Sequence, residues 1–325
     1  MQVRKVVAFD LGNGYMKRCY DGKNVSVDPA IYAFIKEQAF DLSQWDNICK
    51  INNRFAIIGT QAAITKSNAK TVVGEDDINR YKTQEYTDML LSTLMMDLKC
   101  STKIEKLILG LPIQHQKMGI SEDIKKLFEN KQFENVYLNG HSYKIYIKDV
   151  IVMPQPMGTY FYMNAKDKLD DEHILIVDGG FGTVDYNEIN TKKILSSYGN
   201  NAGLKKLYTI VQEQLELKYP GTKLTLYDVQ KIIDSGTIKY MGKTELVDKA
   251  LYSPAFNLQF SIITDDIINR YNSYAQFDRV IFTGGFANAF KDQIVALQHD
   301  YGNIKVAENA QTANVLGFYR FGRGW

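Results

Sequence analysis

The sequence predicts an α/β protein built from two related halves. A glycine-rich turn headed by an aspartate occurs twice, as Asp-Leu-Gly-Asn-Gly at 10–14 and as Asp-Gly-Gly-Phe-Gly-Thr at 178–183, and each follows an apolar run typical of a strand. In the first half a strand, a helical pattern and another strand follow in that order, which is typical of α/β architecture. A chain of 325 residues also has room for two domains of ordinary size.

Both turns have the chemistry of a phosphate site. Glycines stand where the backbone must bend sharply, so the amides can approach an anion without a Cβ in the way. The aspartate at the head of each turn supplies a carboxylate beside that anion. Two such turns predict one nucleotide held between two related halves.

The first half can be divided by its alternation, helical spacing and turn residues. Residues 33–74 differ in character from their surroundings and indicate an insertion on the edge of the first domain, with a strand at 54–58 and a polar stretch at 60–70. The other predicted elements are strands at 3–9, 17–20 and 25–27, a helix at 76–98 and a strand at 104–109.

The second half repeats this plan. Residues 220–254 indicate another insertion, with a helix at 226–233 and a short hairpin at 235–243. Outside it we expect strands at 174–177 and 184–189, an amphipathic helix at 203–217, a long helix at 262–271, a strand at 279–282, and a turn at 283–288 that leads into the next helix.

Composition favours a folded cytoplasmic protein without direct contact to nucleic acid or membrane. The net charge of +2 is too small to favour a nucleic-acid groove or an anionic membrane surface. The three cysteines form no CxxC pair, which favours reduced thiols, and the four histidines have no metal-ligand spacing. We find neither a signal peptide at the N-terminus nor an apolar segment of membrane-spanning length.

Two common nucleotide motifs do not fit. Residues 236–244 approach a P-loop, but five residues separate Gly236 from Gly242 where the motif has four, and a helix precedes them where a buried strand is required. A dinucleotide-binding fingerprint fails because Gly12-Asn13-Gly14 lacks the third glycine and continues into a strand.

The order of the remaining motifs resembles the ATPase superfamily of actin, heat-shock chaperones and sugar kinases. The two Asp-x-Gly turns are accompanied by Gln-Pro-Met-Gly at 155–158 and by Thr-Gly-Gly at 283–285. Within the superfamily the chain is most similar to the bacterial actin-like proteins of the ParM/StbA plasmid-segregation family. Lys17 after the first turn, Gly-Leu-Pro-Ile at 110–113, and the segment 313–320 favour that branch over the sugar kinases.

The resemblance implies the actin-like ATPase fold, in which two related RNase H-like domains surround a nucleotide cleft and each carries an inserted subdomain. Domain IA is expected to comprise residues 1–32, 75–158 and 308–325, with subdomain IB at 33–74. Domain IIA is expected at 159–219 and 255–307, with subdomain IIB at 220–254.

The resemblance also implies the residues that bind a nucleotide. Lys17 is expected to reach the phosphates as a point charge. The base is expected between Gly203 and Lys206 on one side and Gly284, Gly285 and Phe286 on the other, by backbone contact and stacking. The phosphates are expected at the backbone of both turns: Gly12, Asn13, Gly14, Tyr15, Gly179, Gly180, Phe181, Gly182 and Thr183.

Four side chains are implied for hydrolysis. Asp10 and Asp178 would hold Mg²⁺ through its water shell. Gln155 aligns with the residue that orients the attacking water in actin, and Asp185 is a second water-orienting candidate. Some ParM relatives carry Glu where this chain has Gln155, so this position is closer to actin. The resemblance implies ATP as the nucleotide, with GTP as the alternative.

Two functions remain open at this point. The first is a filament protein that assembles head to tail with Mg-ATP, disassembles after hydrolysis and moves plasmid DNA through a small DNA-binding adaptor. The second is a small-molecule kinase of the same superfamily, which needs a carboxylate base facing a hydroxyl group. At the matching position the chain offers Gln-His-Gln at 114–116 and no aspartate, which favours the filament protein. The tail at 320–325 is expected to be either a docked end or a contact for a neighbour.

Overall fold

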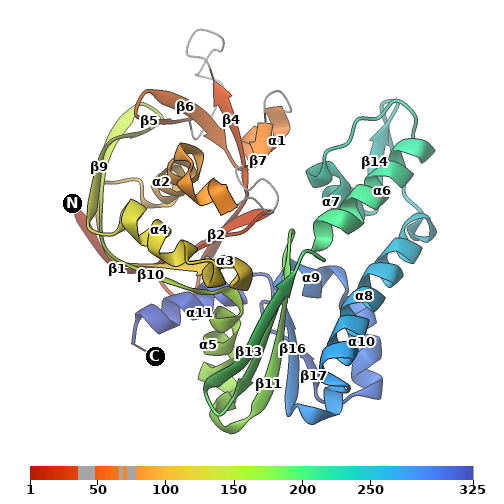
Figure 1. Cartoon of the computed structure of the whole chain (residues 1–325). Coiled ribbons are helices and arrows are strands. Elements are labelled where there is room, and N and C mark those ends of the chain that lie inside the picture. The colour runs from red at the N-terminus through yellow and green to blue at the C-terminus, as the bar shows by residue number, and fades with distance from the viewer. Residues whose placement is uncertain (36–47, 66–68, 72–77, 325) are drawn as a thin grey trace.

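Two β-sheets, each covered by helices, form the two halves of the molecule (Figure 1). The structure is a computed structural model that describes residues 1–35, 48–65, 69–71 and 78–324. Helices α5 (Gln155–Asp167) and α11 (Ala313–Gly322) cross between the halves, α5 against the second sheet and α11 against the first. The predicted α/β class and the two-part architecture are confirmed.

The N-terminal sheet has ten strands within the described residues and curves around α2 (Gln84–Leu98), with α4 (Ile120–Phe128) beside it (Figure 1). Apolar side chains of α2, among them Met89, Leu90 and Leu94, fill the inside of this curve. In spatial order the strands are β3 (Val25–Pro29), β2 (Tyr15–Cys19), β1 (Gln2–Leu11), β8 (Thr102–Leu111), β10 (His141–Pro154), β9 (Lys131–Leu138), β5 (Ile48–Ile51), β6 (Arg54–Ile58), β4 (Ile31–Ile35) and β7 (Ala69–Thr71).

The first predicted insertion extends this sheet. Strand β5 pairs with β9, and β6 and β4 follow outward, so the strands of residues 33–74 continue the sheet of the first domain. The predicted boundary after residue 32 falls inside β4, while residue 74 lies outside the described residues. Part of the predicted polar stretch forms helix α1 (Thr60–Thr65). The division into subdomains stays a prediction.

Helix α2 begins later than its apolar spacing predicts. The predicted start at residue 76 lies outside the described residues, and a 3-10 helix, η2 (Ile78–Lys82), precedes α2. Thr83 separates the two, because its side chain accepts a hydrogen bond from the backbone N–H of Tyr86 and so caps α2. The predicted helix is therefore two helices with a cap between them.

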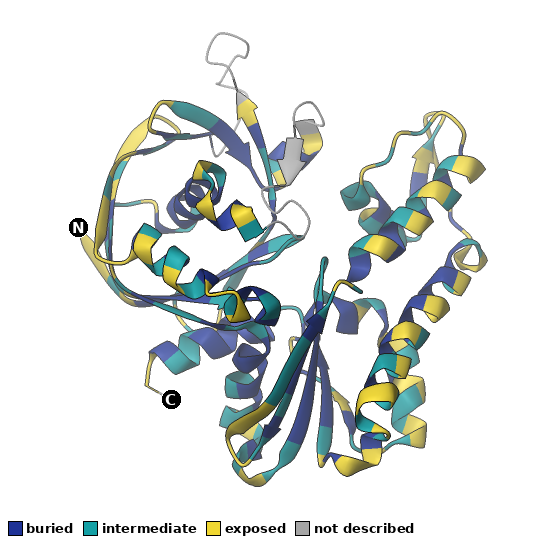
Figure 2. Cartoon of the chain, viewed as in Figure 1, coloured by how far each residue is buried: buried dark blue, intermediate teal, exposed yellow. Residues whose placement is uncertain are grey.

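The C-terminal sheet has five strands in the order β13 (Lys193–Asn200), β12 (Val184–Asn190), β11 (His173–Gly179), β16 (Arg279–Thr283) and β17 (Ile304–Val306). β11, β12 and β16 match predicted strands and are largely buried (Figure 2). β13 was not predicted, because this edge strand is mostly exposed or half-buried and shows no apolar alternation.

Helices α6 (Leu204–Lys218), α8 (Ser253–Tyr271), α9 (Gly284–Ala289) and α10 (Lys291–Asp300) accompany this sheet. α8 starts nine residues before the predicted residue 262. Pro254 marks the predicted boundary of the insertion, but it stands in the first turn of the helix, where its missing N–H would have no helical partner in any case. In the second insertion, α7 (Leu226–Ser235) precedes a hairpin of β14 (Thr237–Tyr240) and β15 (Lys243–Leu246). Helix α7 therefore stands where a P-loop would have its strand, in agreement with the rejection of that motif.

Helices α5 and α11 touch through glycines. A Cβ on Gly317 would overlap the carbonyl oxygen of Gly158, and a Cβ on Gly158 would overlap the backbone of Asn314. The end of α11 is docked as well: the Arg320 guanidinium lies 4.5 Å from the Tyr162 ring centroid, and the Phe321 ring packs against Phe161. Both helices therefore hold the two halves together at close range. Residue 325 lies outside the described residues.

Short elements complete the described chain: α3 (Ile113–Lys117) and three further 3-10 helices, η3 (Leu169–Asp171), η4 (Lys249–Leu251) and η5 (Tyr274–Gln276). Cys19 and Cys49 are buried and Cys100 is half-buried, and none of the three is in a disulfide bond, as expected from their spacing. Among the described residues, no helix is both long enough and apolar enough to cross a membrane.

Candidate nucleotide site

The two aspartate-headed turns have the same local geometry. The Gly12 N–H donates to the Tyr15 carbonyl at 3.1 Å, and the Gly180 N–H donates to the Thr183 carbonyl at 2.8 Å. In each half the donor stands two residues after the aspartate and closes the turn between two antiparallel strands. The duplication seen in the sequence is therefore a duplication of structure.

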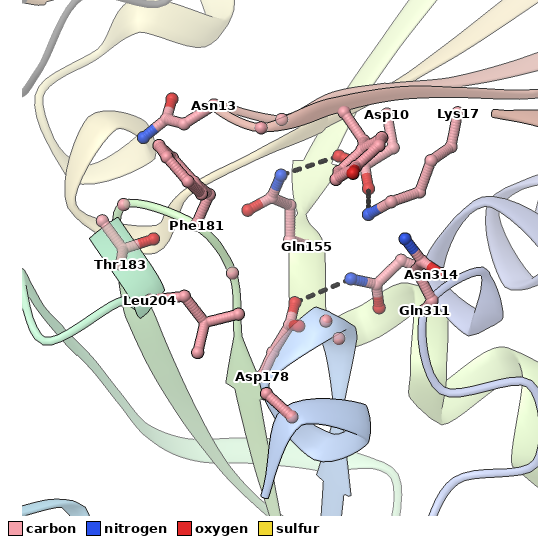
Figure 3. A pocket seen from close by; sticks show the side chains of 18 of the residues that line it. Asp10, Asn13, Lys17, Gln155, Asp178, Phe181, Thr183, Leu204, Gln311 and Asn314 are labelled. Atoms are coloured by element: carbon pink, nitrogen blue, oxygen red, sulfur yellow. Dashed lines mark hydrogen bonds and ion pairs between the residues drawn. The ribbon is translucent and has the colours of Figure 1, made fainter. Parts of the chain in front are cut away.

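Asp10 is placed by the register of the first hairpin. It pairs directly with Lys17 across β1 and β2, so the two side chains meet on one face and form a 3.0 Å ion pair. Its other oxygen accepts a 2.7 Å hydrogen bond from Nε2 of Gln155, which opens α5 just after β10 (Figure 3). Two residues of the first hairpin and one residue of α5 thus form a partly buried cluster at the head of the first turn.

Asp178 is held by Asn314, a residue that the sequence did not single out. Nδ2 of Asn314 donates to Oδ2 of Asp178 at 2.7 Å (Figure 3). The Asn314 oxygen in turn accepts from the backbone N–H and the hydroxyl of Thr159. Because these residues come from α11, β11 and α5, the network joins both halves behind the cleft.

Burial changes the proton affinity of the second carboxylate. Desolvation raises the pKa of Asp178 from its ordinary 3.8 to about 6, although the Asn314 hydrogen bond and the Lys17 charge oppose the rise. Asp185 stands opposite Asp178 on β12, and burial together with the Asp178 charge raises its pKa well above 3.8. Because the two buried carboxyls lie side by side, a nearby positive charge would stabilise their ionised forms.

The two halves touch across the cleft at the turns. A Cβ on Gly14 would lie 2.9 Å from the Cβ of Phe181, and a Cβ on Gly182 would overlap the side-chain nitrogen of Asn13. Further out, the Tyr15 hydroxyl donates to Oε1 of Gln230 on α7 at 2.9 Å. The glycines therefore allow the two turns to meet, and Tyr15 ties the first turn to the second insertion.

One cleft between the halves contains most of the predicted site. Asp10, Lys17, Gln155 and Asp178 all line it. The residues of the turns that line it are Gly12, Asn13, Gly14, Tyr15, Gly180, Phe181, Gly182, Thr183, Gly284 and Gly285.

Five predicted residues do not line the cleft. Phe286 is fully buried and its ring packs on Phe260 and Phe290, so the predicted stacking on a base is wrong for this structure. Gly179 packs against Phe286, since a Cβ there would overlap that side chain. Lys206 is exposed on α6.

Gly203 and Asp185 lie behind the cleft wall. Gly203 packs on the second turn, where its N–H donates to the Gly182 carbonyl, and the next two amides of α6 donate to the carbonyls of Gly180 and Phe181. The start of α6 is thus used to hold the turn, which explains why Gly203 is a glycine: a Cβ would overlap the backbone of Gly182. For Asp185, a role in orienting water stays a prediction.

Several residues of the cleft were missed by the sequence analysis. Asn314 belongs to the segment 313–320, which carries part of the family resemblance. The resemblance did not indicate that its side chain contacts Asp178. The others carry no motif, because they come from helices, or for Gln311 from the turn before α11, whose approach to the cleft depends on tertiary packing: Arg80, Leu204, Tyr208, Gln230, Ile233, Asp234, Asn288 and Gln311.

The residues present fit a nucleotide with Mg²⁺. The turns offer backbone amides and glycines that leave room for phosphates, and Lys17 offers a cation. Asp10 and Asp178 are a suitable pair for Mg²⁺, which keeps several waters and takes few protein ligands. The described residues contain no cluster of three or more His, Cys, Asp or Glu side chains, so they offer no cage for a more fully coordinated metal.

Comparison with known proteins agrees with this geometry. Residues 8–158 match the family described as the N-terminal domain of actin-like proteins. A comparison with curated protein sequences finds no match.

Solved structures extend the similarity to the whole chain. An archaeal actin homologue, Ta0583, has a TM-score of 0.80 and 18% identity, covering 98% of this chain and 99% of its own. A 15-stranded ParM filament from Clostridium botulinum has a TM-score of 0.78 and 21% identity over 100% of both chains. The apo ParM protein of psk41 has a TM-score of 0.73 and 19% identity, covering 99% and 98%. The fold of this chain is therefore the actin-like fold.

Proposed function

We propose that this chain, which has the actin-like fold and whose residues 8–158 match the N-terminal domain of actin-like proteins, is a ParM-type ATPase. It polymerises with Mg-ATP into dynamic filaments, and hydrolysis of ATP to ADP and phosphate promotes their disassembly. The single observation that carries this proposal is the pair of matching turns, one from each half, that face each other across one cleft.

The backbone of both turns would hold the phosphates. Amides fixed in a turn need no reorganisation when an anion arrives, so they stabilise it at little cost. Lys17 is already held beside Asp10 at 3.0 Å and supplies the cation. When bound, Mg²⁺ supplies positive charge for the phosphates. Asp10 and Asp178 would hold it through its water shell. Support for the nucleotide comes from Ta0583, which was also solved in complex with ADP and has 17% identity to this chain.

Gln155 would orient the attacking water. Its Nε2 is occupied by Asp10, which fixes the side chain and leaves its amide oxygen to accept a hydrogen bond from water. An amide is a weak base, so hydrolysis is expected to be slow. A slow step suits a filament protein, because the subunit must remain in the triphosphate state long enough to assemble.

Assembly would follow from closure of the cleft. A nucleotide that contacts both turns favours the state in which the halves are close, and a subunit of fixed shape can repeat head to tail. Head-to-tail contacts are heterologous and open, so they generate a filament. Two filament structures support this proposal: that of the C. botulinum ParM and that of Alp12, which has a TM-score of 0.66 and 17% identity to this chain.

The cargo would be plasmid DNA in the cytoplasm. We propose that a small adaptor protein bound to a repeated plasmid site connects the filament to the DNA. The net charge of +2 agrees with an indirect connection, since a protein that wraps DNA itself needs a strong positive surface. ATP is the proposed nucleotide, and GTP is the alternative to be compared in the same assays.

Phosphate release with and without a sugar panel tests this function against the small-molecule kinase. We expect the wild-type protein to release phosphate from Mg-ATP with no added acceptor. Q155A should slow release by about 10²-fold or more, as expected when a group that positions water is lost, while it still pellets as polymer with Mg-ATP. Transfer of phosphate to a sugar, without polymer, would overturn the proposal. Release by Q155A at the wild-type rate would remove Gln155 from the mechanism.

A further inference from the structure

Arg80 is a buried cation at the edge of the cleft. It belongs to η2, lines the cleft and is only 4% exposed. Its NH1 donates to Oδ1 of Asn13 at 2.6 Å, and its NH2 donates to the Tyr81 hydroxyl at 2.5 Å. Its Nε is buried without a hydrogen-bond partner. Within the described part of the chain, its polar contacts are therefore to neutral groups.

Comparison with Arg18 shows what is missing at Arg80. Arg18 is also buried, at 1% exposure, but it forms ion pairs with Asp28 at 2.8 Å and with Asp97 at 2.5 Å. A buried charge without such a partner destabilises the folded protein, since its hydration is lost and nothing of opposite sign replaces it. Among the described residues, Arg80 therefore has no carboxylate partner, and an anion bound in the cleft would supply one.

The environment of Arg80 fixes its guanidinium before any ligand arrives. The group lies over the Tyr81 ring, 4.6 Å from its centroid. The Tyr81 hydroxyl is in turn 2.7 Å from Nδ1 of His115 at the start of α3. Because a planar guanidinium held in this way can bind phosphate oxygens with two N–H groups, the site is organised for phosphate.

Resting on the proposed function, we propose that Arg80 binds the terminal phosphate of the nucleoside triphosphate and so distinguishes the triphosphate from the diphosphate. Its contact Asn13 stands at the tip of the first turn, where the two halves meet against Gly182. A terminal phosphate that enters between these tips displaces the Asn13 contact and supplies the anion that Arg80 lacks. A diphosphate leaves Arg80 bonded to Asn13.

Binding of ADP and of a non-hydrolysable ATP analogue to R80Q, measured by calorimetry with Mg²⁺, tests the assignment. Charge-assisted hydrogen bonds contribute about 1.5–3 kcal/mol, so the affinity for the ATP analogue should fall roughly tenfold to 150-fold. Affinity for ADP should change less than about threefold. R80K should retain part of the preference, because it keeps the charge and loses the planar geometry. R54Q, on the half-exposed Arg54 paired with Glu85, is the matched control and should bind both as wild type does.

Thermal unfolding of the nucleotide-free variants separates this role from a structural one. R80Q removes a buried charge that has no carboxylate partner among the described residues, so its unfolding temperature should equal or exceed that of the wild type. The proposal would be overturned if R80Q unfolds at a lower temperature than the wild type and its affinities for ADP and for the ATP analogue fall equally. Unchanged binding of both nucleotides by R80Q would overturn it while leaving the proposed function intact. A wild-type protein that binds neither nucleotide would overturn the proposed function itself.

Discussion

At the scale of single residues, the site concentrates buried ionisable groups. Asp178 and Asp185 stand side by side on neighbouring strands and are both buried, and Arg80 is buried without a carboxylate among the described residues. Asp178 and Arg80 line the cleft, so each would gain a partner of opposite charge when a cation and phosphates bind. Ligand binding and stability are therefore coupled at this site.

The pH dependence of stability should reveal the buried carboxyl of Asp178. Its pKa in the folded protein is about 6, above the ordinary 3.8, so the folded state binds this proton more tightly than the unfolded state. The resulting stabilisation is fully present below pH 3.8 and is lost as the pH rises through about 6. The loss corresponds to about 3 kcal/mol, because each pKa unit is about 1.4 kcal/mol.

D178N, measured beside the wild type by denaturant unfolding in EDTA between pH 3 and 8, tests this effect. The amide can still accept the Asn314 hydrogen bond but does not titrate in this range. The difference in unfolding free energy should shift by about 3 kcal/mol in favour of D178N as the pH rises. Parallel curves for the two proteins would show that the Asp178 carboxyl is not desolvated.

Sequence reasoning located the residues whose chemistry depends on local pattern. Asp10, Lys17 and the turn glycines line the cleft as predicted, because an aspartate, a glycine turn and a hairpin register are all local properties. Phe286 was assigned wrongly because a glycine turn does not show which way the following aromatic points. Arg80 was missed because its burial depends on packing between helices and the first turn.

At the scale of elements, the two halves are held together where helices α5 and α11 cross at close range. The Gly158 and Gly317 backbones touch there, and Asn314 and Thr159 form hydrogen bonds in the same place. Sequence alone placed strands β11, β12 and β16 well, because buried strands have clear apolar runs. It missed β13, because an exposed edge strand has no apolar alternation. It also missed the early start of α8, because a proline stands in the first turn of that helix.

G317A tests this close crossing of α5 and α11. Its methyl group would overlap the Gly158 carbonyl, so the helices must separate, and overpacking of this kind costs about 3 kcal/mol or more. We expect the thermal midpoint to fall by more than about 5 °C. G302A is the matched control, since a Cβ there meets no atom within 4 Å and the residue has no positive φ. Equal midpoints for the two variants would contradict the close crossing.

At the scale of the whole molecule, two halves meet over one cleft, and the two turns proposed to hold the phosphates contact each other across it. The turns touch at Gly14 and Phe181, and the Tyr15 hydroxyl reaches Gln230 on the second insertion. The overall architecture was predictable because the duplicated turn repeats in both halves. The way the first insertion joins the ten-stranded sheet was not, because the pairing of β5 with β9 links segments that are distant in the sequence.

The central claim is that nucleotide binding in this cleft controls assembly. Light scattering with electron microscopy, at tens of micromolar protein, tests it most directly when Mg-ATP, Mg-ADP and nucleotide-free samples are compared. The proposed function predicts filaments with Mg-ATP, followed by a fall in scattering as phosphate is released, and little polymer in the other two samples. Equal polymer in all three samples, or none in any, would contradict it.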